Sequence, residues 1–231
     1  MPFMHDAQGR PSAVLFKFGK PEHLEQLRKT GLLFMRSLAY FSDLERSPIV
    51  DPVRADKFEG SDWILHPKEH SITFNWHGST VAIRPDEIAE HTSVSLNSLA
   101  CNVYCMYAVT KPEPVDDRNF EFGSSFVIVL NSFEFRRRFI SSSTRLRLQW
   151  QDGLVEYYEL DKYSGETGAF RKPSRFAYQS EFRLTVRPGV LLRKLEIGNL
   201  EDITSEILPL PEINRIVDLS PETARKAGLS W

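Results

Sequence analysis

The sequence predicts a single α+β domain of mixed or antiparallel sheets with a few short helices. Many short segments are apolar or alternate with period two, as strands do, while helical patterns are few and scattered. Regular alternation of strands with long helices is missing, which disfavours a doubly wound nucleotide-binding fold. The 231 residues, 41% of them apolar, are enough for one substantial core. We therefore expect one domain over residues 1–231, with 1–12 as a flexible N-terminal segment.

The helices follow from their end signals. Helix Pro21–Thr30 has a proline in its first turn, and Gly31 suits its C-terminal cap. Ser37 is expected to cap a short helical turn that runs to Leu44, and Asn131 or Ser132 to cap a helix over residues 133–140. Two further short helices are expected at residues 85–90 and 221–227.

The strands follow from apolar runs and period-two alternation. Residues 99–110 are almost continuously apolar, which indicates a central strand that is buried on both faces. Tight hairpins are expected at residues 77–79, and at 151–153 because Asp-Gly favours such a turn. The expected strands are residues 13–18, 32–35, 63–65, 70–76, 80–84, 99–110, 124–130, 145–150, 154–160, 181–186 and 190–197.

Composition and missing motifs narrow the function classes. The net charge of −2 gives no bulk attraction to nucleic acid or to an anionic membrane. No apolar run approaches the ~18 residues of a membrane span, so we expect a cytoplasmic protein without a membrane partner. Cys101 and Cys105 are expected as reduced thiols on one face of a buried strand, with metal or redox use as the alternative. The chain contains no phosphate-binding Gly-rich loop, no G-x-S-x-G and no Cys-x-x-Cys.

The densest cluster of functional side chains is FRKPSRFAYQSEFRLTV, residues 170–186. In it Glu181 stands at the start of a strand, beside Gln179 and Tyr178. A carboxylate there can bind a ribose hydroxyl or stabilise an oxocarbenium cation, because it accepts hydrogen bonds and supplies negative charge. The alternative is a structural ion pair between Glu181 and Arg183 or Arg175.

Three other groups of charged residues are candidates. In the loop RADKFEG, Asp56 and Glu59 with Arg54 can form a polar wall or a divalent-cation site, or only a solvated loop. Lys17 in an aromatic strand can meet a phosphate or carboxylate, or protect an exposed sheet edge. Three consecutive arginines, at positions 136–138, point in three directions on a helix, so they cannot all contact the same row of phosphates. A solvated helix end is therefore the favoured interpretation.

Four blocks of the chain resemble a family of uncharacterised bacterial and phage proteins, some of them linked to abortive phage infection. The blocks are LFKFGKPEHLEQLRKTGLLFMRSLAYFSDLE, RADKFEG, the CMYA strand with FVIVL, and FAYQSEFRL with LEIGNLEDIT. The same order is more loosely similar to the ADP-ribosyltransferase-like fold, one branch of which has Gln-x-Glu on a late strand. By position, Lys17 matches the first-strand site, Tyr40 or Ser37 the second, and Glu181 the third. The family usually has Arg or His at the first site, and a Ser-Thr-Ser strand that is missing here.

The resemblance implies an NAD-dependent ADP-ribosyltransferase-like enzyme, a toxin or phage-defence effector that modifies a protein or nucleic acid. Glu181 would hold the nicotinamide ribose and Gln179 would orient the acceptor. Lys17 and Arg54 would contact phosphates, and Phe18, Tyr40 or Tyr178 would stack on a base. Glu181→Gln is then expected to abolish NAD turnover with a nearly unchanged melting temperature. The alternatives are a non-catalytic interaction module and a metal-dependent nuclease that uses Asp56 and Glu59.

Overall fold

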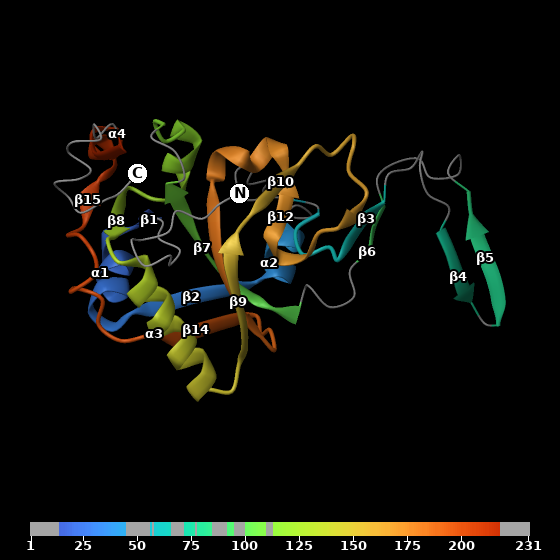
Figure 1. Ribbon diagram of the computed structural model, residues 1–231, viewed down its shortest axis with the longest axis horizontal. Coiled ribbons are helices and arrows are strands. Elements are labelled where there is room, and N and C mark those ends of the chain that lie inside the picture. Colours follow the sequence, from blue (N-terminus) through green and yellow to red (C-terminus); the bar gives the residue numbers. More distant parts are fainter. Residues whose placement is uncertain are drawn as a thin grey trace.

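The computed structural model describes residues 14–44, 56, 58–65, 72–76, 78–84, 92–94, 100–109 and 113–217. A large antiparallel sheet with few helices organises this part of the chain, as Figure 1 shows. Its strands are β1 (Val14–Gly19), β2 (Leu32–Ser37), β7 (Asn102–Val109), β8 (Ser125–Val129), β9 (Gln149–Leu154), β13 (Glu181–Arg187), β14 (Leu192–Glu196) and β15 (Leu208–Pro209). The strand order is β14-β2-β7-β1-β8-β15, and β13 joins β7 to β9. The prediction of an α+β fold with antiparallel sheets is confirmed at this level.

The central strand β7 has two different edges. Along one edge it pairs with β13 from Asn102 to Tyr107. On the other edge its C-terminal end pairs with β1, from Tyr107 onward, and its first two residues pair with β2. No described strand lies opposite residues 104–106 on that second edge. The sheet is therefore split in the middle, where β1 and β2 diverge from β7.

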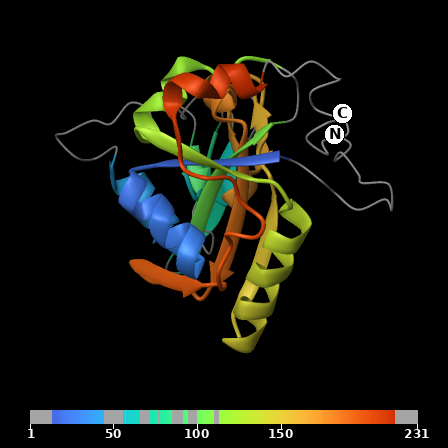
Figure 2. The same cartoon turned by 90° about the vertical axis from the view of Figure 1, so that its left-hand side faces the viewer.

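Two helices cover one face of the sheet. These are α1 (Pro21–Thr30) and α3 (Ser132–Arg145), both visible in Figure 2. Leu24 and Leu27 of α1 and Phe135 and Phe139 of α3 are buried against apolar residues of the strands, among them Leu184 of β13. The remaining helices are α2 (Leu38–Leu44), α4 (Ile213–Val217) and the 3-10 helices η3 (Asp117–Phe122), η4 (Gly168–Phe170), η5 (Ser174–Gln179) and η6 (Leu210–Glu212). None of the described helices is long and apolar enough to cross a membrane.

The helix ends follow the predicted local chemistry. Gly31 follows α1 in the left-handed region (φ 64°), and its N–H donates to the carbonyl of Leu27. The Ser37 hydroxyl accepts a hydrogen bond from the Tyr40 N–H (3.2 Å), which caps α2 as predicted. The Asn131 side chain caps α3 in the same way, through the Glu134 N–H. Residues next to each of these helix ends therefore supply its cap.

The predicted hairpin at residues 151–153 is wrong. Strand β9 runs straight through Asp152 and Gly153, which pair with Leu184 and Arg183 of β13. The Asp152 carboxylate accepts two hydrogen bonds from the Arg136 guanidinium of α3 (2.5 and 3.1 Å), so the side chain serves a tertiary contact instead of a turn. Helix α3 also continues to residue 145, past the predicted end at 140, so the predicted strand at 145–150 begins only at 149.

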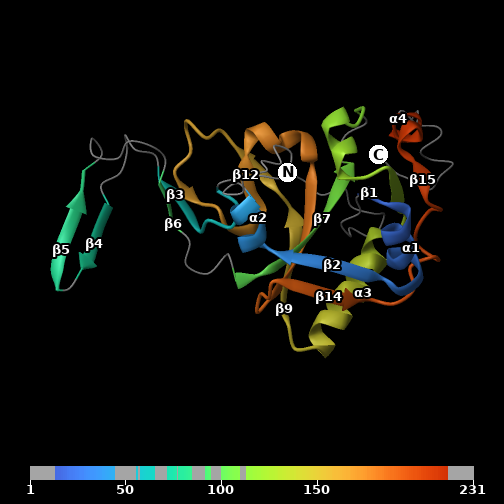
Figure 3. The same cartoon turned by 180° about the vertical axis from the view of Figure 1, so that it is seen from behind.

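Smaller sheets flank the main one. Strand β10 (Glu156–Tyr158), which lies within the predicted strand 154–160, pairs in parallel with β12 (Arg171–Pro173). Strands β3 (Trp63–Leu65), β6 (Thr92–Val94) and β11 (Gly165–Glu166) form a second small sheet. The predicted hairpin at residues 77–79 is present: β4 (Ile72–Trp76) and β5 (Ser79–Ile83) pair across it, at one end of the molecule in Figure 3. The segments 1–12, 85–90 and 221–227 lie outside the described residues.

Candidate functional site

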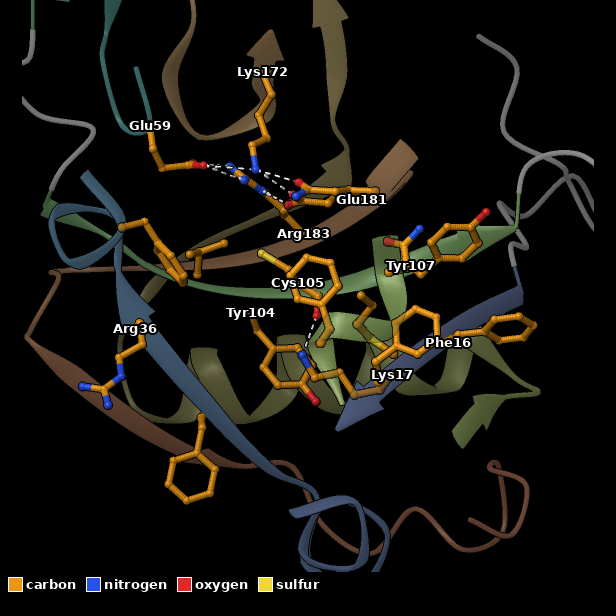
Figure 4. Close-up of a pocket in the computed structure, with 18 residues that line it drawn as sticks. Phe16, Lys17, Arg36, Glu59, Tyr104, Cys105, Tyr107, Lys172, Glu181 and Arg183 are labelled. Carbon is orange, nitrogen blue, oxygen red and sulfur yellow. Dashed lines mark hydrogen bonds and ion pairs between the residues drawn. The ribbon is translucent and has the colours of Figure 1, made fainter. Parts of the chain in front are cut away.

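A pocket of about 230 Å³ lies at the split between β1, β2 and β7 (Figure 4). Its lining combines charged groups, amides and aromatic rings. The charged and amide residues are Lys17, Arg36, Lys172, Arg183, Glu59, Glu181, Asn119 and Gln179. The aromatic residues are Phe16, Phe18, Phe34, Phe41, Tyr104, Tyr107 and Phe122. With four cationic and two acidic side chains, the described lining carries a net positive charge.

One face of the sheet brings most of these residues together. Phe16 of β1 lies opposite Tyr107 of β7, which in turn lies opposite Glu181 of β13. Residues directly opposite each other in a ladder share a face, so the three form a row across three strands. Cys105 and Arg183 form a second such pair in the adjoining row. The pocket is therefore built from segments that are far apart in the sequence.

Lys17 enters the pocket through the split. Its partner in the ladder is Val127, which belongs to the core under α1 and α3, so Lys17 starts from the opposite face. Its ammonium donates to the carbonyl of Cys105 (2.7 Å) and lies 4.3 Å from the centre of the Tyr104 ring. That carbonyl belongs to the stretch of β7 without a strand opposite it, so the ammonium satisfies a backbone acceptor. The interpretation of Lys17 as an edge-strand lysine is wrong, because β1 lies between β7 and β8.

Four charged side chains form a buried cluster on one wall, which we call the ion quartet: Glu59, Lys172, Glu181 and Arg183. Each is at most 8% exposed. The two oxygens of Glu181 lie 2.9 Å from the Lys172 ammonium and 2.6 Å from Nε of Arg183. The carboxylate of Glu59 accepts two hydrogen bonds from Arg183 (2.7 and 3.1 Å) and lies 3.4 Å from Lys172. Figure 4 shows these contacts as dashed lines above the pocket.

The quartet stays ionised at neutral pH. Burial by itself raises the pKa of the Glu181 carboxyl, but the charges of Arg183 and Lys172 hold that pKa well below its usual range. The pKa of Glu59 is lowered by the same two cations, against the effect of its burial. Burial lowers the pKa of the Lys172 ammonium, but Glu181 and Glu59 raise it above its ordinary value. The charges of the quartet sum to zero, so the net positive charge of the lining comes from Lys17 and Arg36.

The backbone between Gln179 and Glu181 explains why both face the pocket. Ser180 is left-handed (φ 40°) and ends η5, with its N–H donating to the carbonyl of Ala177. Its hydroxyl donates to the carbonyl of Ala108 on β7 (2.7 Å), which anchors the turn to the sheet. The chain thus changes direction at Ser180 and enters β13 at Glu181. The buried Gln179 amide accepts from the Lys172 ammonium through Oε1 (2.8 Å).

The structure brings together four of the seven predicted site residues. Lys17, Phe18, Gln179 and Glu181 all line the pocket. Of the other three, two are tyrosines that do not line the pocket and one is an arginine. The lining does not include Tyr40, whose ring lies 4.6 Å from the Arg36 guanidinium, or Tyr178, whose ring lies 3.8 Å from that of Arg118. Both rings stack on arginines, and their role as base-stacking residues stays a prediction. Arg54 lies outside the described residues.

The predicted polar loop is buried where it is described. Asp56, Glu59 and Ser61 are 1%, 5% and 2% exposed, so the alternative of a solvated loop is wrong. One Asp56 oxygen accepts from the Phe58 N–H (3.0 Å), and burial with the nearby Glu59 charge raises the pKa of Asp56 to about 6. The described residues include no group of three or more His, Cys, Asp or Glu placed to hold a metal ion. The metal-site interpretation of Asp56 and Glu59 therefore gains no support.

The remaining candidates are structural. Arg136 pairs with Asp152, Arg137 with Glu134, and Arg138 with Glu134 and Asp202. Only Arg137, with 62% of its side chain exposed, is largely solvated. Cys101 and Cys105 form no disulfide and lie in one apolar cluster, and burial raises the pKa values of the two thiols to about 11 and about 12. Such thiols are protonated at neutral pH and unreactive.

Sequence reasoning missed Lys172 and Arg36. Lys172 belongs to the basic, aromatic stretch that begins at residue 170, but nothing local distinguishes it from its basic neighbours. Its position depends on the parallel pairing of β12 with β10, which places it beside Tyr157. Arg36 alternates with buried Met35 in β2, and this alternation would have predicted its outward direction without indicating a pocket.

Comparison of the chain with protein-family models, with curated proteins and with solved structures finds no match.

Proposed function

We propose that the protein is an NAD-dependent ADP-ribosyltransferase-like enzyme, acting as a cytoplasmic toxin or phage-defence effector. The observation that supports this most is the meeting of Glu181, Gln179 and Lys17 around one aromatic pocket. An ionised carboxylate, a cation and flat rings are the groups that recognise a ribose, a phosphate and a base, respectively. The acceptor would be a protein or a nucleic acid.

The arrangement suits glycosyl transfer. As the bond from the ribose C1′ to the nicotinamide nitrogen breaks, nicotinamide leaves with the bonding electrons and positive charge builds on the ribose. The Glu181 carboxylate, held ionised by Lys172 and Arg183, would stabilise that charge. The acceptor would then attack C1′ and lose a proton, with Gln179 orienting it. Lys17 and Arg36 would contact the phosphates. Pockets for drug-sized ligands usually measure roughly 300–1,000 Å³, so this one would enclose only one end of the dinucleotide.

Calorimetric titration with NAD, together with measured nicotinamide release, tests the proposal. Arg36 is an exposed cation of the lining, so Arg36→Ala is expected to weaken NAD binding about 10- to 100-fold with little effect on folding. Arg137→Ala, an exposed arginine outside the lining, is the control and should bind NAD like the wild type. Glu181→Gln should lose nicotinamide release. Absence of NAD binding by the wild-type protein would refute the proposal.

A second candidate is a non-catalytic interaction module. The specific observation in its favour is that both oxygens of Glu181 are already ion-paired, as in a purely structural cluster. Thermal shift separates the two candidates. A dose-dependent rise of the melting temperature with NAD supports the enzyme, whereas no rise with NAD or related nucleotides supports the module.

A further inference from the structure

We propose that Lys172 is a positioning residue of this pocket, which fixes the orientation of the Gln179 amide and of the Glu181 carboxylate without contacting the ligand. The inference rests on the proposed function, since it assigns a role within the same reaction. It concerns a residue that the resemblance does not indicate.

The three hydrogens of the Lys172 ammonium match three surrounding oxygens. Nζ lies 2.8 Å from Oε1 of Gln179, 2.9 Å from Oε1 of Glu181 and 3.4 Å from Oε2 of Glu59. The first two contacts are hydrogen bonds, and the third is an ion pair. The residue is only 4% exposed, and its ammonium lies 4.7 Å from the centre of the Phe176 ring. The charge of Lys172 is therefore already matched by two buried carboxylates, unlike that of a ligand-binding lysine.

The ammonium determines which end of the Gln179 amide faces it. Only the amide oxygen can accept from Lys172, because a flipped amide would place its NH₂ group against another donor. Nε2 consequently points away from Lys172, and it lies 3.3 Å from the Tyr178 hydroxyl. A ligand or acceptor that reaches Gln179 meets N–H groups there.

The backbone keeps Lys172 at a fixed distance from Glu181. In the parallel ladder of β10 and β12, Lys172 lies beside Tyr157. The hydroxyl of Tyr157 accepts from the Glu181 N–H (2.9 Å), and the Val155 N–H donates to the Glu181 carbonyl (2.9 Å). The small sheet that carries Lys172 is thus attached to the first residue of β13 by a hydrogen bond with Tyr157 in β10 and by a second one with Val155, the residue before β10. Groups held by packing and by a second layer of hydrogen bonds are the ones that can keep a reacting geometry.

Chemical rescue and a double-mutant cycle test this role through nicotinamide release. Lys172→Ala is expected to lower kcat about 100-fold, the loss that a misplacement of roughly 1 Å can cause, with a smaller change in KM. Ethylammonium in the assay should restore at least part of kcat, whereas ethanol, its uncharged counterpart, should not. Gln179→Ala should cost much less in the Lys172→Ala background than in the wild type, because the amide is no longer held. Active variants that show no rescue and fully additive losses would overturn the inference.

A measurement on the wild-type protein does not depend on NAD. The Gln179 NH₂ signals, identified by their disappearance in Gln179→Ala, should show a nuclear Overhauser effect to the ring protons of Tyr178. A flipped amide would turn its oxygen toward Tyr178 and give none, which would overturn the inference even if NAD is turned over. If NAD is not turned over but the effect is present, the proposed function fails while the inferred orientation of the Gln179 amide holds.

Discussion

Removing the guanidinium of Arg183 should destabilise the fold far more than removing an exposed arginine. Arg183 is 2% exposed and donates to Glu181, to both oxygens of Glu59 and to the carbonyl of Ala169. In Arg183→Met the two buried carboxylates keep only Lys172 as a counter-charge. Breaking a buried ion pair by removing one partner costs about 3–5 kcal/mol. For a chain of this size each kcal/mol lowers the melting temperature by about 2–4 °C, so we expect a fall of about 6–20 °C.

The matched control is Arg137→Ala, which removes an arginine that is 62% exposed and paired with Glu134 on the same helix. Such a pair contributes about 0–1 kcal/mol, so the melting temperature should fall by about 4 °C at most. Circular dichroism melts at pH 7 compare the two variants. Equal melting temperatures for Arg183→Met and Arg137→Ala would refute the electrostatic account of the quartet.

Glu181→Gln should lower the melting temperature, contrary to the expectation from the sequence. A nearly unchanged melting temperature fits an exposed strand-edge carboxylate, but Glu181 is buried between two cations. Its loss should lower stability by about 3–5 kcal/mol, so nicotinamide release must be measured well below the melting temperature of the variant. In the wild type, the pKa values of Glu59 and Glu181 are lowered by folding. The stability that they contribute is therefore present above pH ~4.5, the unfolded value, and is lost as the pH falls toward their folded pKa values.

Two further substitutions test single sites. Folding raises the pKa of Asp56 from 3.8 to about 6, so the ionised carboxylate is costly and stability should fall as the pH rises from about 4 to 6. Asp56→Asn should remove that fall and gain up to about 3 kcal/mol at pH 7, measured by urea unfolding at several pH values; an unchanged pH profile would contradict the prediction. Lys17→Met leaves the Cys105 carbonyl without its donor at the split, and should cost about 1–3 kcal/mol. Lys29→Ala, which removes an exposed lysine of α1, is the control, and thermal melts compare the two variants. If Lys17→Met loses no more stability than Lys29→Ala, the Cys105 carbonyl does not need this donor.

The sequence alone determined the elements whose signals are local. Proline at the start and glycine after the end define α1, and the Ser37 hydroxyl begins α2, because a cap is satisfied by backbone groups within a few residues. The almost continuous apolar run around β7 indicated a central strand, since a strand buried on both faces tolerates such a run. Gln179 and Glu181 were found because polar and aromatic residues cluster where a strand begins.

Tertiary structure alone decided what those side chains do. Glu59 and Arg183 are 124 residues apart, and no local pattern indicates that they meet. The Asp-Gly pair in β9 has the local signal of a turn, but pairing with β13 and the contact from Arg136 outweigh that preference. The charge state and partners of Glu181 depend on burial and on cations brought in from β12 and β13. Local sequence determines the hydrophobic period of a segment and the caps of a helix. Ion pairs such as Glu59–Arg183 depend on distances in space, which are short only once the sheet has formed.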